Sequence, residues 1–301
     1  MAARKKKPPS AWLQLLRAPN LLTVPGDPLL GYVLAVGRAT DVTPILMLAA
    51  AASGALLYGA GLIVNDLVDY DEDRRDRPER PLPSGRIPCE AARHAAALGT
   101  GGGLALAFSC GLRSLLVAAL LLALSLLYNF RLKRRPLWGP IAMGGCRGLN
   151  LLLGAAAAGR PLAADALTAA ALLALYIVTI SLIARRETEA RYPGIICLLP
   201  TAVLAGAGVV MTVEAGNWWL ALPPLLLLPA VREAALINMR LRADPAHYLP
   251  LAIGAWLGLL PILQGAYLIA FRKDRAALIA VVALLLLAWW NKRLRTKYYA
   301  S

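Results

Sequence analysis

The sequence predicts an all-α fold, a polytopic membrane bundle of nine to ten transmembrane helices. The first supporting observation is composition: of 301 residues, 59% are apolar and 16% are charged, whereas soluble domains are nearer half apolar and a quarter charged. The second is a mean hydropathy of +0.60. The third is that apolar residues gather in stretches of about 15 to 24 residues with few or no charges, the length that crosses a bilayer as a helix. A soluble enzyme, a disordered chain and a disulfide-rich secreted module are therefore excluded.

Ten apolar stretches predict one span each. They lie near residues 20–37, 43–64, 95–111, 114–130, 137–158, 166–184, 192–213, 217–236, 248–271 and 276–290. The first contains Asp27 between Pro25 and Pro28, and the eighth contains three prolines, so we expect a break in the first helix and a kink or a break in the eighth. The last stretch has 15 residues, which leaves nine spans as an alternative. The spans leave no room for a separate soluble domain, so residues 1–301 form one predicted domain that begins with a basic segment, 1–12.

The connections between spans alternate in charge. Those after even-numbered spans are basic or strongly charged, at residues 65–93, 131–136, 185–191 and 237–247. Those after odd-numbered spans are mostly short and weakly charged, apart from 271–275. Because cytoplasmic loops carry an excess of Lys and Arg, we expect the N-terminus and the acidic motifs at the cytoplasmic face of a bacterial inner membrane or its equivalent. The net charge of +15 lies mostly in these loops and the termini, which favours the lipid bilayer over nucleic acid as a partner.

An acidic segment starts where the second span ends. Asp66, Asp69 and Asp73 are spaced i, i+3 and i+7, so a helix continued from the span presents them on one side. Asn65 can reach the same side from the membrane end. Carboxylates this close repel one another, and a divalent cation among them makes the arrangement tolerable. Mg²⁺ binds carboxylate oxygens and commonly shares its other sites with phosphate, so the segment predicts a Mg²⁺ site, with a solvated run of charges as the alternative.

A proline-rich turn with several arginines follows, over residues 76–87. Its arginines can bind anionic oxygens, because a planar guanidinium group offers several hydrogen-bond donors. The arginines placed for this role are Arg77, Arg80 and Arg86. Carboxylates, a metal and arginines together form the chemistry of a diphosphate site. Because this site adjoins apolar helices, it suits an amphiphile with a diphosphate head and a hydrocarbon tail.

The pattern Asn65-Asp66-x-x-Asp69-x-x-x-Asp73, followed by Arg80-Pro81-Leu82-Pro83-Ser84-Gly85, resembles the first signature of the UbiA superfamily of intramembrane aromatic prenyltransferases. The resemblance implies a helical membrane bundle, usually of nine spans, around a central cavity open to lipid. It also implies transfer of a prenyl chain from an allylic diphosphate, with Mg²⁺ held by two acidic motifs. Lys133, after the fourth span, looks like the family's diphosphate-binding lysine, and Asn20 matches a polar position in its first helix.

The family's second motif, Asp-x-x-x-Asp, follows the sixth span, and this chain departs from it. Glu187 can replace the first Asp, but Arg191 stands four residues further on. Arg185 or Arg186 can replace the charge of a second Mg²⁺ at the diphosphate. A positive-inside loop with solvated acids is the alternative. This segment and Arg147-Gly148-Leu149-Asn150 look like the UbiA-like branch of ebo-type gene clusters.

Polar residues inside the spans are costly and usually face a cavity or a partner. Arg147 and Asn150 share one face of the fifth span, so we expect contact with the diphosphate or the acceptor, with an interhelical pair as the alternative. Asp27 is expected in the cavity wall or at the acceptor, with a shallow interfacial position as the alternative. Aromatic rings can stabilise an allylic cation, although they also form interfacial belts. The tyrosines placed for this role are Tyr58, Tyr128 and Tyr176.

Together these patterns predict a Mg²⁺-dependent intramembrane prenyltransferase that moves an isoprenyl chain from a prenyl diphosphate to a lipophilic acceptor, aromatic or quinone-precursor-like. A non-catalytic isoprenoid or prenyl-diphosphate binder or transporter is the alternative. The predicted catalytic residues are Asp66, Asp69 and Asp73, which with Glu187 are also the predicted metal ligands. The predicted diphosphate-binding residues are Asn65, Arg77, Arg80, Lys133 and Arg186. The predicted acceptor or cavity residues are Asn20, Asp27, Tyr58, Tyr128, Arg147, Asn150 and Tyr176.

Overall fold

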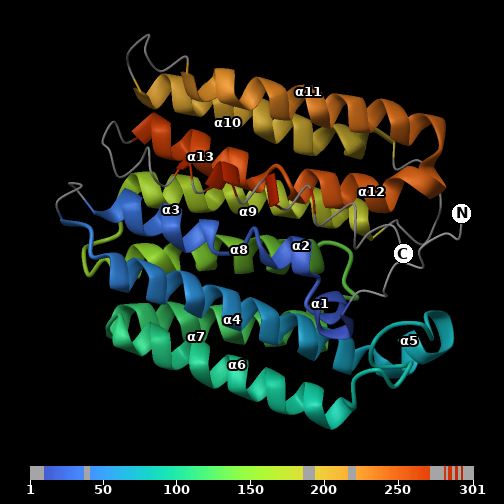
Figure 1. Ribbon diagram of the computed structural model, residues 1–301. Coiled ribbons are helices and arrows are strands. Elements are labelled where there is room, and N and C mark those ends of the chain that lie inside the picture. Colours follow the sequence, from blue (N-terminus) through green and yellow to red (C-terminus); the bar gives the residue numbers. More distant parts are fainter. Residues whose placement is uncertain are drawn as a thin grey trace, which may run out of the picture.

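The regular structure of the chain is helical. The computed structural model describes residues 10–36, 41–185, 194–215 and 222–271, with eight more residues between 281 and 293. Over these residues every regular element is a helix and no strand occurs (Figure 1). The all-α prediction is therefore confirmed for the part of the chain that is described.

Five described stretches are long and apolar enough to cross a membrane. They are Pro44–Val68, Leu112–Leu132, Ala164–Ala184, Gly194–Met211 and His247–Ala270. Large apolar side chains such as Ile45, Leu116 and Leu120 are exposed on the outside of these helices, as expected where lipid replaces water as the solvent. The chain is an integral membrane protein.

The first predicted span is interrupted. The chain forms two short helices, α1 (Ala11–Leu15) and α2 (Ala18–Leu21), before α3 (Gly26–Ala35) begins. The expected break is present, but it lies at residues 22–25, and Asp27 falls in the first turn of α3. A break leaves backbone groups without helical partners, so this region needs polar side chains from other helices.

The acidic segment lies at one end of the bundle. Helix α4 (Pro44–Val68) carries Asn65 and Asp66 at its end, and α5 (Tyr70–Asp76) follows after Asp69. After a proline-rich turn, α6 (Cys89–Ser109) returns along α4, and Gly111, at φ 111°, leads into α7 (Leu112–Leu127). Helix α7 continues as a π-helix, η2 (Tyr128–Leu132).

Helix α8 (Trp138–Ala157) occupies the middle of the bundle and crosses α3 closely. A Cβ atom added to Gly31 would lie 1.9 Å from the carbonyl oxygen of Leu151. A Cβ atom added to Gly154 would lie 1.9 Å from the carbonyl oxygen of Pro28. Small residues therefore set the distance between these two helices, as is common in membranes.

The C-terminal half contains α9 (Ala164–Ala184), the 3₁₀-helix η4 (Gly194–Leu198), α10 (Leu199–Ala215), α11 (Leu222–Ala243), α12 (Pro245–Leu257) and α13 (Leu260–Phe271). Over its described residues the eighth predicted span has no break, because α11 is one continuous helix from Leu222 to Ala243; the kink stays a prediction. Pro223 and Pro224 lie in its first turn, where an N–H has no helical partner to lose. The ninth predicted span is divided instead, at Gly258 and Leu259. Of the tenth, only residues 281–282, 284–286 and 289–290 are described, all helical.

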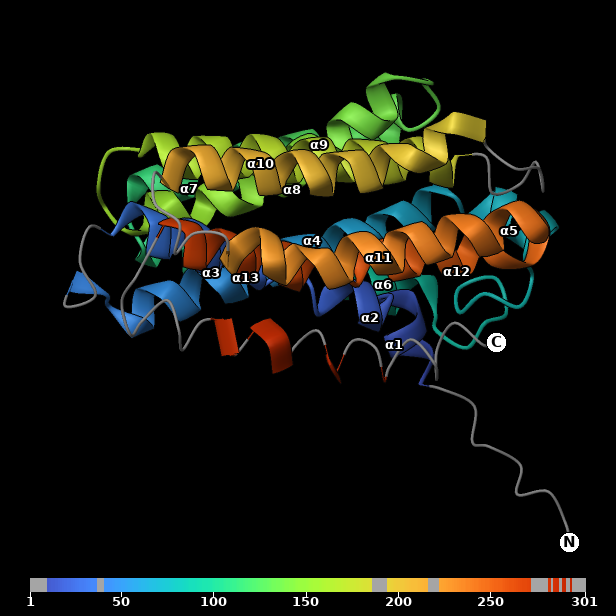
Figure 2. The same cartoon turned by 90° about the horizontal axis from the view of Figure 1, so that it is seen from above.

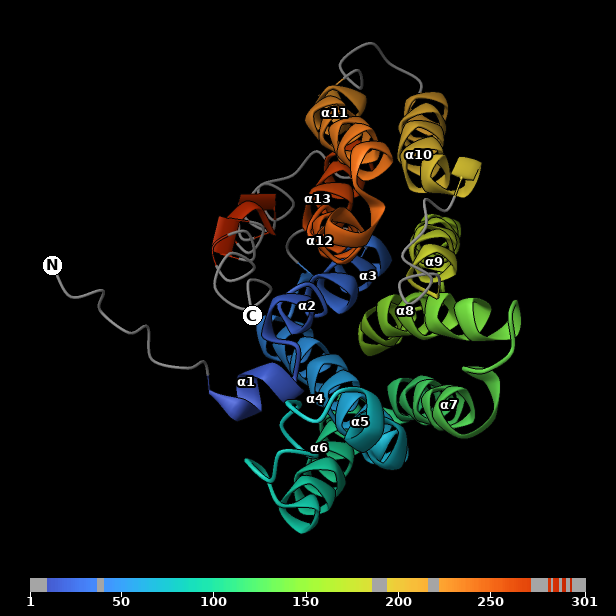
Figure 3. The same cartoon turned by 90° about the vertical axis from the view of Figure 1, so that its right-hand side faces the viewer.

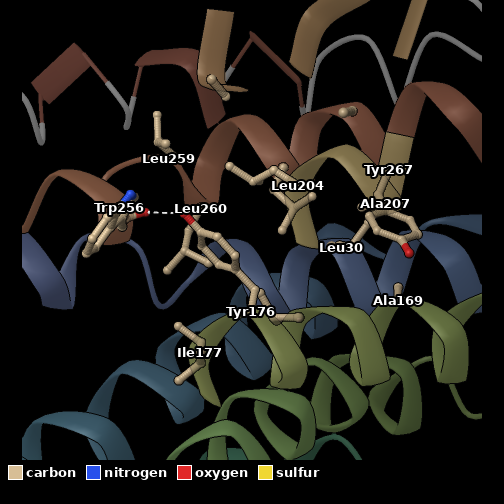
Figure 4. Packing of buried hydrophobic residues seen from close by; sticks show 14 of the residues in the cluster. Leu30, Ala169, Tyr176, Ile177, Leu204, Ala207, Trp256, Leu259, Leu260 and Tyr267 are labelled. Atoms are coloured by element: carbon tan, nitrogen blue, oxygen red, sulfur yellow. Dashed lines mark hydrogen bonds between the residues drawn. The ribbon is translucent and has the colours of Figure 1, made fainter. Parts of the chain in front are cut away.

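The helices form two sides that enclose the functional site. Seen along the helices, α7, α8, α9 and α10 lie on one side, and α6, α4, α3, α12, α13 and α11 lie on the other (Figure 3). The view from above separates α7–α10 from α3, α11, α12 and α13 in the same way (Figure 2). The largest buried apolar cluster joins the two sides, and Figure 4 shows Tyr176 of α9 beside Trp256 of α12.

Candidate functional site

A cavity of about 1610 Å³ lies between the two sides of the bundle. Side chains of α4, α5, the turn after α5, α7, η2, α8, α9 and α12 line it, together with residues of α1 and α2. On α4 the lining runs from Gly54 to Asp66, which corresponds to roughly 18 Å along a helix. The predicted site residues that line this cavity are Asn20, Tyr58, Asn65, Asp66, Asp69, Asp73, Arg77, Arg80, Tyr128, Lys133, Arg147 and Asn150.

The three aspartates of the acidic segment share the mouth of the cavity. Asp66 and Asp73 are each 6% exposed, although both lie in a strongly polar segment. Asp71 and Glu72 of the same segment are exposed. The predicted carboxylates therefore line the cavity, as the i, i+3, i+7 spacing indicates, whereas Asp71 does not; Glu72 is exposed but also lines the cavity.

Each of these carboxylates is paired with a cation from a different segment. Asp66 Oδ1 lies 3.1 Å from Arg17 Nη2, which belongs to the link between α1 and α2. Asp73 Oδ2 lies 2.6 Å from Arg80 Nη1, and Asp69 is paired with Lys133, which follows η2. Because these pairs are partly buried, salt screens them less than it screens fully exposed pairs. The mouth of the cavity thus contains these three ion pairs, beside further acidic and basic side chains of the lining.

The arginine-rich turn is held by its own hydrogen bonds. The backbone N–H of Ser84 donates to the Arg80 carbonyl at 3.0 Å, and the Ser84 hydroxyl donates to the same carbonyl at 2.6 Å. Gly85 has φ 72°, a conformation that glycine adopts readily. Arg86 donates to the Glu79 carbonyl at 2.7 Å and to Gln14 Oε1 at 2.8 Å. Arg86 thus closes the turn and ties it to α1, whereas Arg80 reaches the carboxylates.

A π-helix places two residues at the mouth. In η2 the backbone N–H of Lys133 donates to the Tyr128 carbonyl at 2.9 Å, five residues earlier. π-turns of this kind occur frequently at functional sites. Lys133 reaches Asp69 from this turn. Asn129, which is 3% exposed, contacts Asn65 and the Gly61 carbonyl of α4.

A second polar cluster is buried deeper in the bundle. Arg147 Nε lies 2.9 Å from Asp27 Oδ2, and Arg147 Nη2 donates to Asp27 Oδ1 at 3.0 Å. Asn150 Nδ2 donates to Asp27 Oδ2 at 2.9 Å, and Gln264 Nε2 donates to Asp27 Oδ1 at 2.6 Å. Arg147 Nη2 also donates to the Thr23 carbonyl at 3.2 Å, a carbonyl freed by the break before α3. The cluster joins α3, α8 and α13, and its buried charges compensate each other.

The comparisons with known proteins decide the family. A sequence model described as the UbiA prenyltransferase family matches residues 28–236. The chain belongs to the UbiA prenyltransferase family. The family resemblance seen in the acidic segment is therefore confirmed, and so is the predicted enzyme class, prenyltransferase. The narrower resemblance to the ebo-type branch stays a prediction.

Curated relatives of this UbiA family chain share one name. This chain is 30% identical to the digeranylgeranylglyceryl phosphate synthase of Methanoculleus marisnigri, over 70% of this chain and 78% of that protein. It is 34% identical to the synthase of the same name from Methanopyrus kandleri, over 50% of this chain and 54% of that protein. For the second relative, the match thus spans about half of its length.

Solved structures of UbiA homologues share the fold. The apo structure of a UbiA homologue from Aeropyrum pernix K1 has a TM-score of 0.65 at 19% identity and covers 84% of this chain and 98% of that chain. A UbiA homologue from Archaeoglobus fulgidus bound to DMAPP and Mg²⁺ has a TM-score of 0.64 at 16% identity, covering 91% of this chain and 99% of that chain. At these identities the likeness establishes the fold alone.

Two predicted cavity residues lie elsewhere in this UbiA chain. Asp27 is fully buried in the polar cluster and does not line the cavity, because three side chains surround its carboxylate. Tyr176 is also fully buried and lies in the apolar core, where its hydroxyl donates to the Trp256 carbonyl at 2.8 Å (Figure 4). The predictions for Arg186 and Glu187 lie outside the described residues.

Two residues that line the cavity, Arg17 and Asn129, and one residue of the buried polar cluster, Gln264, were missed by the sequence analysis. Arg17 lies just before the first span and has φ 44° and ψ 58°, a left-handed conformation that is uncommon for a residue with a side chain. Asn129 lies at the end of an apolar span, and Gln264 lies within one. The available signal was the polarity of Gln264 inside a span, since such residues usually have a partner. No local pattern marks Arg17 or Asn129.

The donor set at the mouth suits a hard cation. Among the described residues, no three His, Cys, Asp or Glu side chains are gathered into a ready-made metal site. Mg²⁺ does not need one, since it is commonly bound through one or two carboxylates, several waters and substrate phosphates. The three aspartates and the amide oxygen of Asn65 supply oxygen ligands of this kind. The chemistry of these groups therefore fits Mg²⁺ bound together with a phosphate-containing substrate.

Proposed function

We propose that this chain transfers an isoprenyl group from an allylic diphosphate to a lipophilic acceptor within the membrane. The observation that carries the proposal is the set of three carboxylates, each paired with a cation, at the mouth of the large cavity. The mouth can bind a metal and a diphosphate together, and the remaining cavity, walled largely by apolar helices, can hold a hydrocarbon chain. Names of the curated relatives support a prenyl transfer reaction.

In this proposal Asp66, Asp69 and Asp73 hold Mg²⁺, with Glu187 contributing from the second segment. When bound, Mg²⁺ neutralises negative charge on the departing diphosphate. The remaining charge is neutralised by cationic side chains. Those that line the mouth are Arg17, Arg77, Arg80 and Lys133. Arg186 is added from the sequence prediction, and Asn65 contributes its uncharged amide to binding of the diphosphate.

The transfer breaks the bond between the prenyl C1 and the diphosphate oxygen, and the electron pair leaves with that oxygen. The acceptor nucleophile forms the new bond to C1. Its proton passes to the diphosphate or to a carboxylate of the acidic segment. Tyr58 and Tyr128 line the cavity and can face the allylic cation, while the surrounding apolar side chains exclude water.

The acceptor is proposed to enter along the wall that contains Asn20, Arg147 and Asn150. The charge of Arg147 is compensated by Asp27, so this wall offers polar contacts without net charge. That favours an uncharged polar group, such as the hydroxyl of an aromatic or quinone-precursor-like acceptor. The relatives' name instead suggests a prenylated glycerol phosphate, whose phosphate would be bound by the Arg and Lys side chains of the mouth.

The whole chain, residues 1–301, is proposed to form one such domain with nine to ten spans and a cavity open to lipid. The basic segment 1–12 and the acidic segment would lie at the cytoplasmic face. A non-catalytic prenyl-diphosphate binder or transporter is the alternative. Transporters concentrate their substrate groups near the membrane midplane, whereas the three ion pairs of the acidic segment lie at one end of the bundle.

The test is a product assay with the full chain in lipid nanodiscs. Labelled farnesyl or geranylgeranyl diphosphate and Mg²⁺ are incubated with a hydroxylated aromatic acid, with geranylgeranylglyceryl phosphate, or with a total lipid extract. Asp69→Asn and EDTA should each abolish the product. Asp71→Asn changes an exposed aspartate of the same acidic segment that does not line the cavity; it is the matched control and should retain the product.

A labelled product in the first or second arm identifies the acceptor class. Metal-dependent binding of the donor without product in any arm would favour the binder or transporter. Equal activity of Asp69→Asn and Asp71→Asn would contradict the proposed role of the acidic segment.

A further inference from the structure

The amide group of Asn65 has two chemically different ends. Its oxygen can bind a cation, whereas its NH₂ group is only a donor and cannot. Asn65 lines the mouth of the cavity beside Asp66. Its usefulness to a metal or a diphosphate complex therefore depends on which end faces the cavity, and neighbouring residues must determine this.

A chain of hydrogen bonds determines the orientation. The carbonyl oxygen of Gly61 can only accept, and Asn129 Nδ2 donates to it at 3.2 Å. Asn129 Oδ1 therefore points the other way and accepts from Asn65 Nδ2 at 2.9 Å. The Asn65 NH₂ group is thus held against Asn129, and the polarity of the chain cannot be reversed because it starts at a backbone carbonyl.

The oxygen of Asn65 is consequently directed to the charged side of the mouth. Asn65 Oδ1 lies 3.5 Å from Arg17 Nη2, and Asp66 Oδ1 lies 3.1 Å from the same nitrogen. One cationic group therefore contacts both the amide oxygen and the carboxylate oxygen. The two oxygens lie on the same side of α4, where a cation is attracted to both.

Asn129 is well placed to hold this orientation rigidly. It is 3% exposed, and both ends of its amide group are used by α4. It belongs to η2, the π-helix from which Lys133 also reaches the acidic segment. Groups that orient a metal ligand in this way commonly change metal affinity when they are mutated.

We propose that Asn129 is a positioning residue that holds the oxygen of Asn65 toward the metal–diphosphate site. This inference rests on the proposed function, since it assumes that the mouth binds a divalent cation with diphosphate. It assigns Asn129 a role through Asn65 and no contact of its own with the substrate.

The test measures Mn²⁺ binding to the full chain in nanodiscs with inorganic diphosphate present, by the loss of the electron paramagnetic resonance signal of free Mn²⁺. Asn129→Leu should weaken Mn²⁺ binding by about 10- to 100-fold. In the double variant Asn129→Leu/Asn65→Asp, both ends of residue 65 are oxygens, so orientation no longer matters and binding should recover. Asn238→Leu is the matched control, because Asn238 is also buried, pairs with Thr201 and does not line the cavity.

The outcomes separate the inference from the proposed function. Absence of Mn²⁺ binding by the unmodified chain overturns the proposed function, and the role of Asn129 with it. Normal binding by Asn129→Leu overturns the role of Asn129 alone. An equal loss in the single and double variants shows that Asn129 only supports the fold, which also overturns the inference. Asn129→Ala, which adds no bulk, replaces Asn129→Leu if thermal unfolding shows that the leucine variant is not folded.

Discussion

Single residues inside the bundle show how a membrane protein accommodates charge. Asp27 is fully buried, and Arg147, Asn150 and Gln264 all donate to its carboxylate. An isolated charge in this position would be strongly unfavourable, whereas a paired and hydrogen-bonded charge is tolerated. Arg147 also donates to the Thr23 carbonyl in the break before α3, so it joins this break to the central helix α8.

Removing one partner of this pair should destabilise the protein strongly. Arg147→Met leaves Asp27 buried without its cation, and we expect a loss of about 3–5 kcal/mol in the free energy of unfolding. The double variant Arg147→Met/Asp27→Leu should recover much of this loss, because no buried charge remains. Thermal unfolding in nanodiscs measures both variants. Arg113→Met, at an exposed position, should change stability by no more than about 0.5 kcal/mol; a similar small effect for Arg147→Met would contradict the explanation.

At the scale of elements, the acidic segment is held by cations from three separate parts of the chain. Arg17 comes from the link between α1 and α2, Arg80 from the turn after α5, and Lys133 from the end of η2. In the proposed function the same cations bind diphosphate while the carboxylates bind metal. Metal binding then frees the cations for diphosphate, and diphosphate binding frees the carboxylates for metal. Each of these two ligands should therefore favour binding of the other.

This exchange predicts opposite effects of Lys133→Met on the two ligands. Without the competing ammonium group, Asp69 should bind Mn²⁺ alone more tightly. Binding of inorganic diphosphate should weaken by about tenfold or more, since a charge-assisted contact contributes about 1.5–3 kcal/mol. Titration calorimetry with each ligand alone and with both together measures the coupling. A loss of affinity for both ligands would show that Lys133 supports the fold of the mouth instead.

The crossing of α3 and α8 depends on two glycines that face backbone carbonyls. Gly31→Ala would place a Cβ atom 1.9 Å from the Leu151 carbonyl oxygen, which cannot move aside without moving α8. We expect a loss of stability of at least about 1–3 kcal/mol, as for other overpacked positions. The control Gly101→Ala has no atom within 4 Å of the new Cβ and should be neutral or stabilising by up to about 1 kcal/mol. Equal melting temperatures for the two variants would contradict the close crossing.

At the scale of the whole molecule, helix α6 connects the two ends of the bundle. It runs from Cys89 to Ser109, or 21 residues, which corresponds to about 31 Å and therefore to the thickness of the hydrocarbon core. Its first end adjoins the turn after the acidic segment, and its second end adjoins the tight turn into α7. A label at each end of this one helix therefore reports the orientation of the protein in the membrane.

The positive-inside rule predicts the result of such labelling. In a background with the native cysteines replaced, Ser109→Cys should react with a membrane-impermeant maleimide on intact cells. Glu90→Cys should react only after the cells are permeabilised, because the acidic end is expected to be cytoplasmic. Both residues are exposed, so accessibility to the reagent is matched. The reverse pattern would place the proposed diphosphate site on the outer face.

Local sequence patterns determined the helical membrane fold, the family and which aspartates of the acidic segment share one side. Apolar length predicts spans because the bilayer sets a minimum length, and the i, i+3, i+7 spacing of Asp66, Asp69 and Asp73 predicts one side because helical geometry is local. Only the tertiary structure decided which partners these residues have. Arg17 and Lys133 are 49 and 64 residues away from the aspartates that they contact, and Arg147 is 120 residues away from Asp27. Such pairs depend on how whole helices cross, and no periodicity within one segment encodes that geometry.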